Sequence, residues 1–228
     1  MAKVKVVTAY VPLPVKHLSR RQYEELGNRL AVACGEERIR GFYDYPVEHC
    51  WAYKYKDLPP AQPVATDRYA TPADFVLSNI VQHQRTTWAR MAAAEDMDAD
   101  VFVWLDFGIL KQGQFTGKPV EAGMVTEFLN RIERAELKDI PFPGIWPRGD
   151  ISDTGDNWRF VGSTHIWPRQ YLDLIDLFYK VECRRFIERT KTISNDLPVW
   201  AHVEAHWPLP FRFYPANHDA TQLTNFGG

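Results

Sequence analysis

An acidic residue at the end of an apolar segment is the first candidate for chemistry. Asp106 follows the apolar residues 101–105, and Gly108 comes two positions later. Ionising a carboxylate inside a dry core is expensive, so we expect Asp106 to face a cleft, a cation or hydrogen-bond donors. Gly108 would let the backbone approach a ligand closely. The alternative is a structural aspartate that caps the following turn.

The densest group of ionisable residues lies near the C-terminus. His202, Glu204 and His206 alternate with apolar residues. In an extended segment, this alternation would put all three side chains on one side, where they could form a general base or a metal cluster. An edge strand with ordinary polar residues fits the same pattern. A zinc site made of these three residues alone is not expected, because the spacing His-x-Glu-x-His matches no zinc motif.

Alternating strand and helix patterns must position these groups. Strand patterns occur over 3–10, 38–45, 99–108 and 158–166, with weaker ones at 50–55 and 199–204. Helices are predicted over 19–35, 71–96, 119–137 and 168–189, and an irregular loop over 138–157.

This alternation is typical of a parallel or mixed sheet with helices on both faces. In such sheets, ligands bind beyond the carboxyl ends of the strands. Two strand ends are therefore candidates for binding a ligand, Thr8-Ala9-Tyr10 and Asp106-Phe107-Gly108.

Composition narrows the class of protein. The chain has 228 residues, of which 45% are hydrophobic and 25% charged, as in a globular protein, and we expect a single domain over 1–228. No apolar segment approaches the roughly 18–20 residues of a membrane span. Lys and Arg total 27 against 29 Asp and Glu, so the basic excess of a dedicated nucleic-acid binder is absent.

Cysteine usage and motif searches exclude several further classes. The cysteines Cys34, Cys50 and Cys183 are far apart, which favours reduced thiols in a cytoplasmic protein over a disulfide framework. The sequence contains no GxGxxG, GxxxxGK[ST], GxSxG or HExxH motif. A Rossmann dehydrogenase, a P-loop NTPase, a typical α/β hydrolase and a zincin are therefore not expected.

One segment carries a family resemblance. A helix followed by Ala-Asp-Val-Phe-Val-Trp-Leu-Asp, ending at Asp106, resembles the strand that carries the DxD motif in GT-A nucleotide-sugar glycosyltransferases. The version Trp-Leu-Asp-Phe-Gly is most similar to the HtrL/YibB-type family. The resemblance implies a GT-A-like, Rossmann-like domain that moves a sugar from a nucleoside-diphosphate donor to a hydroxyl acceptor. That acceptor would be a glycan or a modified nucleic-acid base, and the mild acidity of the chain disfavours nucleic acid.

The resemblance also implies roles for particular residues. Thr8, Ala9 and Tyr10 would hold the nucleotide, and Arg85 and Gly108 would lie near the diphosphate. Asp106 would hold a divalent cation, Mn²⁺ or Mg²⁺, with help from His218, because glycine stands at position 108 where the family has its second acid. The implied catalytic residues are Glu204 and His202, and the implied acceptor-binding residues are His165 and Trp167.

Several alternatives stay open at this point. Arg85 fits a solvated helix face, and residues 158–167 fit a core strand with a buried histidine. The missing second acid is compatible with a non-catalytic relative that binds nucleotides or glycans. The cluster at 202–206 is compatible with a metal-dependent hydrolase.

Overall fold

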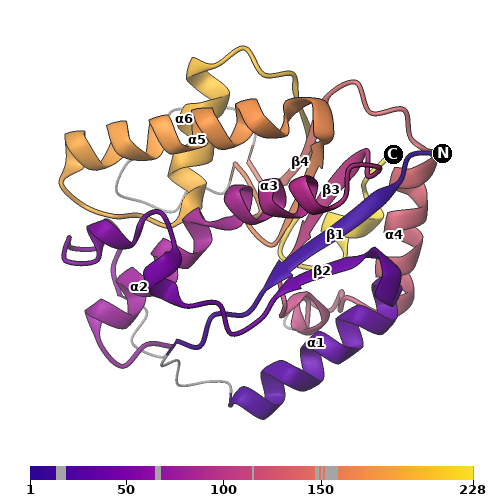
Figure 1. Ribbon diagram of the computed structural model, residues 1–228, viewed down its shortest axis with the longest axis horizontal. Helices are drawn as coiled ribbons and strands as arrows, with labels where there is room; N and C mark the ends of the chain where they lie inside the picture. The colour runs from indigo at the N-terminus through magenta and orange to yellow at the C-terminus, as the bar shows by residue number, and fades with distance from the viewer. Residues whose placement is uncertain are drawn as a thin grey trace.

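A four-stranded sheet lies at the centre of the computed structural model, which describes residues 1–13, 19–64, 68–114, 116–146, 149, 151 and 159–227 (Figure 1). Its strands, in spatial order, are β2 (Ile39–Phe42), β1 (Val4–Ala9), β3 (Val101–Leu105) and β5 (Thr164–Pro168). β1 runs parallel to both β2 and β3, whereas β5 is antiparallel to β3. The expected α/β class with a mixed sheet is confirmed.

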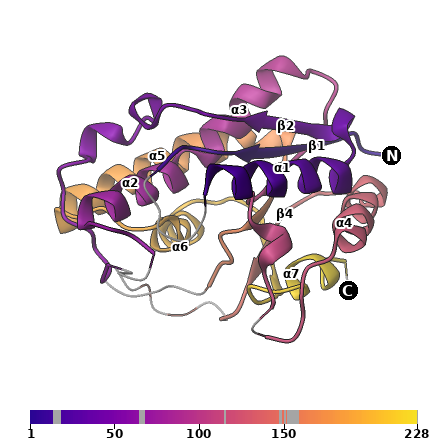
Figure 2. The same cartoon turned by 90° about the horizontal axis from the view of Figure 1, so that it is seen from below.

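Helices cover both faces of this sheet (Figure 2). One face carries α1 (Arg20–Cys34), α4 (Ala122–Arg134) and the short α7 (Thr221–Thr224). The other face carries α3 (Arg85–Glu95), α5 (Arg169–Thr190) and α6 (Asp196–His206), with α2 (Pro72–His83) leading into α3. None of the helices in the described ranges is both long and apolar enough to cross a bilayer.

The pleat of β3 explains why the sheet has two cores. All five residues of β3 are buried, as expected for a strand covered on both faces. Successive side chains alternate between the faces. Val101, Val103 and Leu105 therefore pack with α1 and α4, while Phe102 and Trp104 pack with α3 and α5.

Capping residues set the helix starts that the sequence predicts. Ser19 and Gln22 form a reciprocal capping box at α1, and Thr71 and Asp74 form another at α2. The predicted helix over 71–96 is wrong in one respect, because the chain breaks at Gln84 and forms two helices. The break places Arg85 at the start of α3, where it turns toward the sheet.

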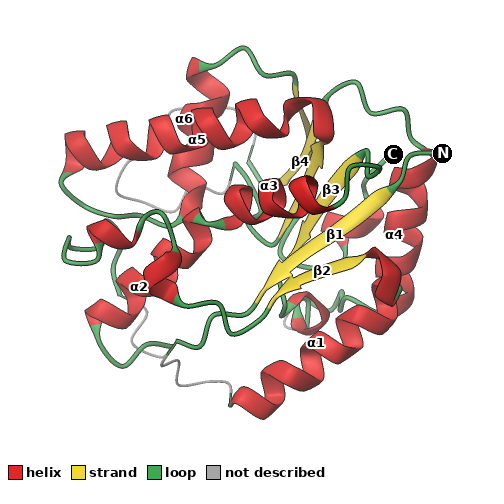
Figure 3. Cartoon of the chain, in the orientation of Figure 1, coloured by secondary structure: helices red, strands yellow, loops and turns green. Residues whose placement is uncertain are grey.

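Three other expectations are corrected. The supposed loop over 138–157 contains the strand β4 (Ile140–Gly144), labelled in Figure 3. β4 pairs in parallel with β6 (Phe211–Pro215) in a separate two-stranded sheet. The weak strand at 50–55 is a pair of turns that includes the 3₁₀ turn Tyr53–Tyr55. The segment 199–204 belongs to α6 rather than to a strand.

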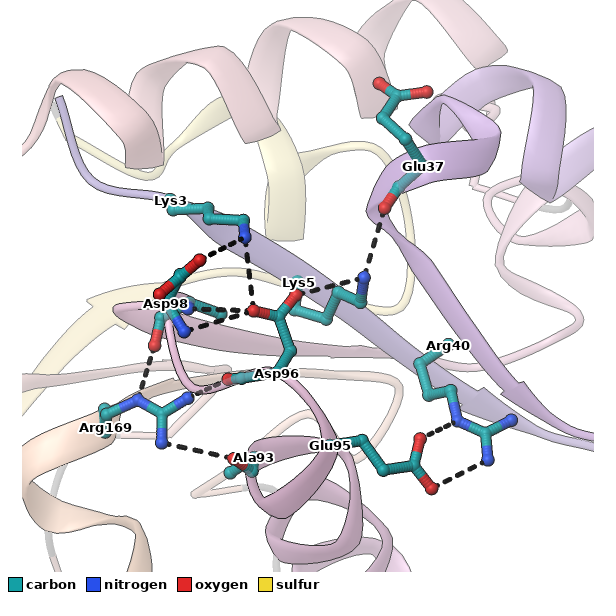
Figure 4. Close-up of polar contacts among 10 residues, drawn as sticks. Lys3, Lys5, Glu37, Arg40, Ala93, Glu95, Asp96, Asp98 and Arg169 are labelled. Atoms are coloured by element: carbon teal, nitrogen blue, oxygen red, sulfur yellow. Dashed lines mark hydrogen bonds and ion pairs between the residues drawn. The ribbon is translucent and has the colours of Figure 1, made fainter.

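A polar cluster ties the sheet to α3 at the amino ends of β1 and β3 (Figure 4). Asp96 forms ion pairs with Lys3 and Lys5, each at 3.2 Å. Arg169 donates to the carbonyl oxygens of Asp96, of Ala93 at 3.3 Å and of Ala99 at 2.5 Å. Carbonyls at a helix C-terminus have no partner within the helix, so this arginine supplies a donor at the end of α3 and in the turn that leads to β3.

The carboxyl ends of the parallel strands meet at the opposite edge. Ala9 lies opposite Phe42, and Val7 lies opposite Trp104. The residues that follow, among them Tyr10, Tyr43 and Asp106, therefore leave the sheet at one edge.

Candidate functional site

Asp106 follows the central strand β3, and its carboxylate accepts hydrogen bonds from two side chains. Its Oδ1 accepts from the indole Nε1 of Trp104 at 2.7 Å and from Nη2 of Arg85 at 3.0 Å. The side chain keeps 30% of its surface exposed, and Oδ2 lies farther from Arg85, at 3.4 Å. Asp106 is thus held in place and still presents part of its carboxylate to a ligand.

Arg85 joins Asp106 to a second carboxylate. Its Nη1 donates to Oδ2 of Asp196 at 2.5 Å, and its guanidinium lies 5.4 Å from the centre of the Trp104 ring. Arg85 is buried, so the alternative of a solvated helix face is wrong. Asp196, the first residue of α6, is only 2% exposed, and burial raises the pKa of its carboxyl despite the lowering effect of Arg85.

A polar cavity of about 540 Å³ opens at this bridge. Its floor is the Arg85 bridge with Asp106 and Asp196, and further polar lining comes from Gln62, Arg68, Tyr69, Asn79, Gln82, Gln112, Ser163, Asn195 and His218. A Cβ on Gly162 would lie 3.2 Å from Nη1 of Arg85, so a glycine at this position leaves room for the bridge. Another groove, of about 600 Å³, lies near Met1 at the opposite edge of the sheet. The acidic residues in its lining are partly or fully exposed, unlike Asp196.

Two side-chain amides in the cavity wall have buried atoms without a hydrogen-bond partner in the described ranges. Asn79 is fully buried, and neither its amide oxygen nor its amide nitrogen has a hydrogen-bond partner within the described ranges. The amide nitrogen of Gln62 is also buried and unpaired there. Most buried polar groups in proteins are hydrogen-bonded to protein groups or to ordered water, so we expect ordered water at these amides.

A second, aromatic cavity lies on the other side of the same strand end. It encloses about 260 Å³ and is lined by the rings of Tyr10, Tyr23, Tyr43 and Phe107, with Arg20 and Asp44 also in its lining. The ring centroids of Tyr10 and Tyr23 are 4.8 Å apart, and those of Tyr43 and Phe107 are 5.7 Å apart. Flat or sugar-like rings suit such a lining.

Of the three residues predicted to hold the nucleotide, one lines a cavity and two belong to β1. Tyr10 lines the aromatic cavity, whereas Thr8 is fully buried within β1 and Ala9 lies at its end. Gly108 follows Asp106, and a Cβ added there would meet no atom within 4 Å. The protein's own packing therefore does not require a glycine at position 108.

The predicted acceptor-binding residues do not face a cavity. His165 and Trp167 are fully buried, and the His165 ring contacts Phe142 and Trp200 with centroids 4.7 and 5.3 Å away. Burial lowers the pKa of His165 well below its usual value. Their predicted role is therefore corrected: both belong to the core on the α5–α6 face, as the alternative interpretation had it.

The two predicted catalytic residues, Glu204 and His202, also lie outside the cavity at Asp106. Glu204 accepts from Nε and Nη2 of Arg159 at 3.0 and 2.6 Å, in a bidentate pair. His202 lies 3.0 Å from Nη2 of Arg189, on α5. Neither residue lines the cavity at Asp106, because α6 is a helix whose N-terminus, not its C-terminal half, reaches that cavity.

Asp196 is the acidic residue that the sequence analysis missed. It begins α6, after the long helix α5, and lies eight positions before Glu204. A signal existed, because Asn195 is a good helix N-cap and its side chain accepts from the backbone of Leu197. Arg85 lies 111 positions away in the sequence, so no local pattern indicates its ion pair with Asp196.

His218, the residue predicted to help Asp106 hold a cation, lies in the lining of the same cavity. It lines the cavity together with Asp106, and that carboxylate acts against the burial that lowers the pKa of His218. Mg²⁺ and Mn²⁺ are usually bound by one or two carboxylates together with phosphate oxygens and water. One accessible carboxylate and one imidazole fit that incomplete protein ligand set.

Comparisons with known proteins bear on the fold. No family model and no curated protein matches the sequence. Among solved structures, the chain resembles a glycosyltransferase involved in the glycosylation of the major capsid of PBCV-1, with a TM-score of 0.52 and 11% sequence identity. The match covers 94% of this chain and 81% of that chain. At this level of identity the likeness concerns the fold, which is glycosyltransferase-like.

Proposed function

We propose that the protein is a glycosyltransferase that moves a sugar from a nucleoside-diphosphate donor to a hydroxyl acceptor. The observation that carries this proposal is the Arg85 bridge between Asp106 and Asp196, at the carboxyl edge of the sheet and on the floor of a polar cavity. The glycosyltransferase-like fold supports it, as does the solved structure of a glycosyltransferase involved in the glycosylation of the major capsid of PBCV-1. The segment Trp-Leu-Asp-Phe-Gly remains the basis for expecting a relative of the HtrL/YibB-type family.

The two cavities suit the two ends of a nucleotide sugar. Asp106 lines the polar cavity and its neighbour Phe107 lines the aromatic one. We place the base among the aromatic rings, where stacking on Tyr10 stabilises it. The diphosphate would then cross the chain at Asp106-Phe107, and the sugar would enter the polar cavity, where the partly exposed amides of Gln82 and Asn195 could meet its hydroxyls.

Charge at the bridge favours a divalent cation in this reaction. Arg85 is engaged by the carboxylates of Asp106 and Asp196, so its charge is not available to neutralise a diphosphate, and Arg68 is a further arginine in the cavity lining. Asp106 and His218 would hold the cation. When bound, the cation would stabilise the negative charge that grows on the departing diphosphate. Arg85 is a positioning residue, because its guanidinium is engaged by both carboxylates and fixes that of Asp106.

Asp196 takes the place that the sequence analysis gave to Glu204. During transfer, the bond from the anomeric carbon to the diphosphate oxygen breaks, a bond to the acceptor oxygen forms, and the acceptor hydroxyl loses its proton. Asp196 lines the sugar-binding cavity, and the raised pKa of its carboxyl favours proton uptake. We therefore assign the proton acceptor to Asp196.

Binding of the donor tests the site directly. We expect nucleoside diphosphates and their sugars, screened with and without Mn²⁺, to raise the melting temperature of the protein. Asp106→Asn should abolish that rise, whereas Asp98→Asn, an exposed control at the other edge of the sheet, should keep it. If Asp106→Asn binds donors as well as the wild type does, the assignment of the site is wrong.

Turnover separates the proposed enzyme from a non-catalytic relative. Release of nucleoside diphosphate that depends on an added glycan or other hydroxyl acceptor would support transfer. Binding without release would favour the non-catalytic alternative. The hydrolase alternative centred on 202–206 has less support, because Glu204 is held by Arg159 and α6 carries these residues away from the cavity.

A further inference from the structure

Two histidines and a buried glutamate meet where α6 ends on α5. His202 and His206 are four positions apart on α6, so they lie on one face of that helix. Glu182 reaches them from α5 and is only 1% exposed. One ligand atom of each residue lies within 4.8 Å of the ligand atoms of the other two.

The arrangement is close to that of a metal site with three protein ligands. Zinc binds imidazole nitrogen and carboxylate oxygen at about 2.0–2.2 Å, which puts neighbouring ligand atoms ~3.4 Å apart around a tetrahedral ion. Rotations that move the side chains by about 1 Å would close the difference. Paired histidines at i and i+4 on one helix face are a known zinc-binding arrangement. The sequence analysis missed it because it treated the segment as extended and Glu204 as the third member.

Hydrogen bonds around the cluster already orient the ligands. Oε1 of Glu182 accepts from Nε1 of Trp207 and from Nη1 of Arg185, both at 2.9 Å, and Oε2 lies 3.1 Å from Nδ1 of His206. A guanidinium can only donate, so Nε2 of His202, 3.0 Å from Arg189, carries a lone pair. Partners of this kind fix the orientation of metal-binding side chains.

Nearby charge determines which ion would bind. Among the described residues that contact the cluster, Arg185 and Arg189 bring two positive charges and Glu182 one carboxylate. A hard ion such as Mg²⁺ or Mn²⁺, which depends on several oxygens, is therefore disfavoured. Zn²⁺, Co²⁺ and Ni²⁺ gain more from imidazole, and a bound ion would displace the contact of Arg189 with His202.

We propose that Glu182, His202 and His206 form a site for a transition-metal ion of the zinc type, which fastens α6 to α5. The site is separate from the cavity at Asp106 and does not rest on the proposed glycosyl transfer. Water would complete the coordination, because His206 is 47% exposed.

Metal titration of the chelator-treated protein tests the proposal. We expect one equivalent of Zn²⁺ to bind by calorimetry and to raise the melting temperature, and Co²⁺ to give the visible absorption of a protein-bound ion. His206→Ala should weaken Zn²⁺ binding at least tenfold. This variant removes a half-exposed ring, so the fold should survive. Glu182→Gln should also weaken binding, with circular dichroism to confirm that it folds.

A matched histidine outside the cluster provides the control. His49 is exposed and distant from α6 in the chain, so His49→Ala should bind Zn²⁺ as the wild type does. The proposal is overturned if the wild type binds no Zn²⁺ tighter than about 100 μM, a free energy of roughly −5.5 kcal/mol. It is equally overturned if His206→Ala and His49→Ala have the same affinity as the wild type.

Discussion

Removing the guanidinium of Arg85 should destabilise the protein in a way that depends on pH. In Arg85→Met, Asp196 would keep a carboxylate that is 2% exposed and has lost its closest cationic partner. Breaking a buried ion pair by removing one member costs about 3–5 kcal/mol. We expect a loss of this size near pH 8.

The pH dependence follows from the pKa of Asp196. Burial already raises that pKa, and loss of Arg85 would raise it further. A carboxyl whose pKa is higher in the folded than in the unfolded state favours folding when protonated, and this contribution is lost as the pH rises through the folded-state pKa. The deficit of Arg85→Met relative to the wild type should therefore be smaller at pH 5 than at pH 8.

Urea unfolding at both pH values measures the effect. The double variant Arg85→Met/Asp196→Asn removes both charges and should recover most of the loss. Arg40→Met is the matched control, because Arg40 makes a bidentate pair with Glu95 in which both side chains are more than one-third exposed. Exposed pairs are worth about 1 kcal/mol or less.

Two results would refute the reasoning about Arg85. One is a loss at pH 8 no larger than that of Arg40→Met. The other is a loss that is the same at pH 5 and pH 8, since an uncompensated carboxylate at position 196 must respond to protons.

Three further predictions concern the aromatic cavity, the edge of α3 and a buried histidine. Tyr10→Ala should weaken binding of nucleoside diphosphates by about tenfold in calorimetry, because a stacked base is worth about 1–3 kcal/mol, and an unchanged affinity would argue against a base in this cavity. Arg169→Ala should lower the free energy of unfolding by at least about 2 kcal/mol, because carbonyls at the end of α3 lose a charged donor, and a loss within error would contradict that role. Burial lowers the pKa of His83 to about 4, so the folded state excludes a proton that the unfolded state binds below about pH 6.5. Stability should fall by about 3 kcal/mol as the pH drops from 6.5 to 4, and His83→Gln should show a flatter profile in urea unfolding.

The central strand could be predicted because its signal is local. Five buried residues on a strand covered from both sides form one apolar run, and the run ends at Asp106. The capping boxes at Ser19 and Thr71 are equally local, and they set the starts of α1 and α2.

Helix α6 could not be predicted because it lacks a polar face over most of its length. Every residue from Asp196 to Val203 is buried, so no 3.6-residue periodicity distinguishes it from a strand. The alternation around Glu204 fits either structure. The pairing of Asp196 with Arg85 depends on how α3 and α6 pack, which no local pattern records.

The walls of the two cavities come from separate parts of the chain. α1 and the ends of β1 and β2 build the aromatic one, whereas α2, the start of α6 and the C-terminal segment contribute to the polar one. Within the described ranges the two cavities share no lining residue, and Asp106 in one is followed directly by Phe107 in the other. Selectivity for one half of a ligand can therefore change without rebuilding the other half. Exchange of α1 side chains should alter the preferred heterocycle while leaving the choice of monosaccharide intact.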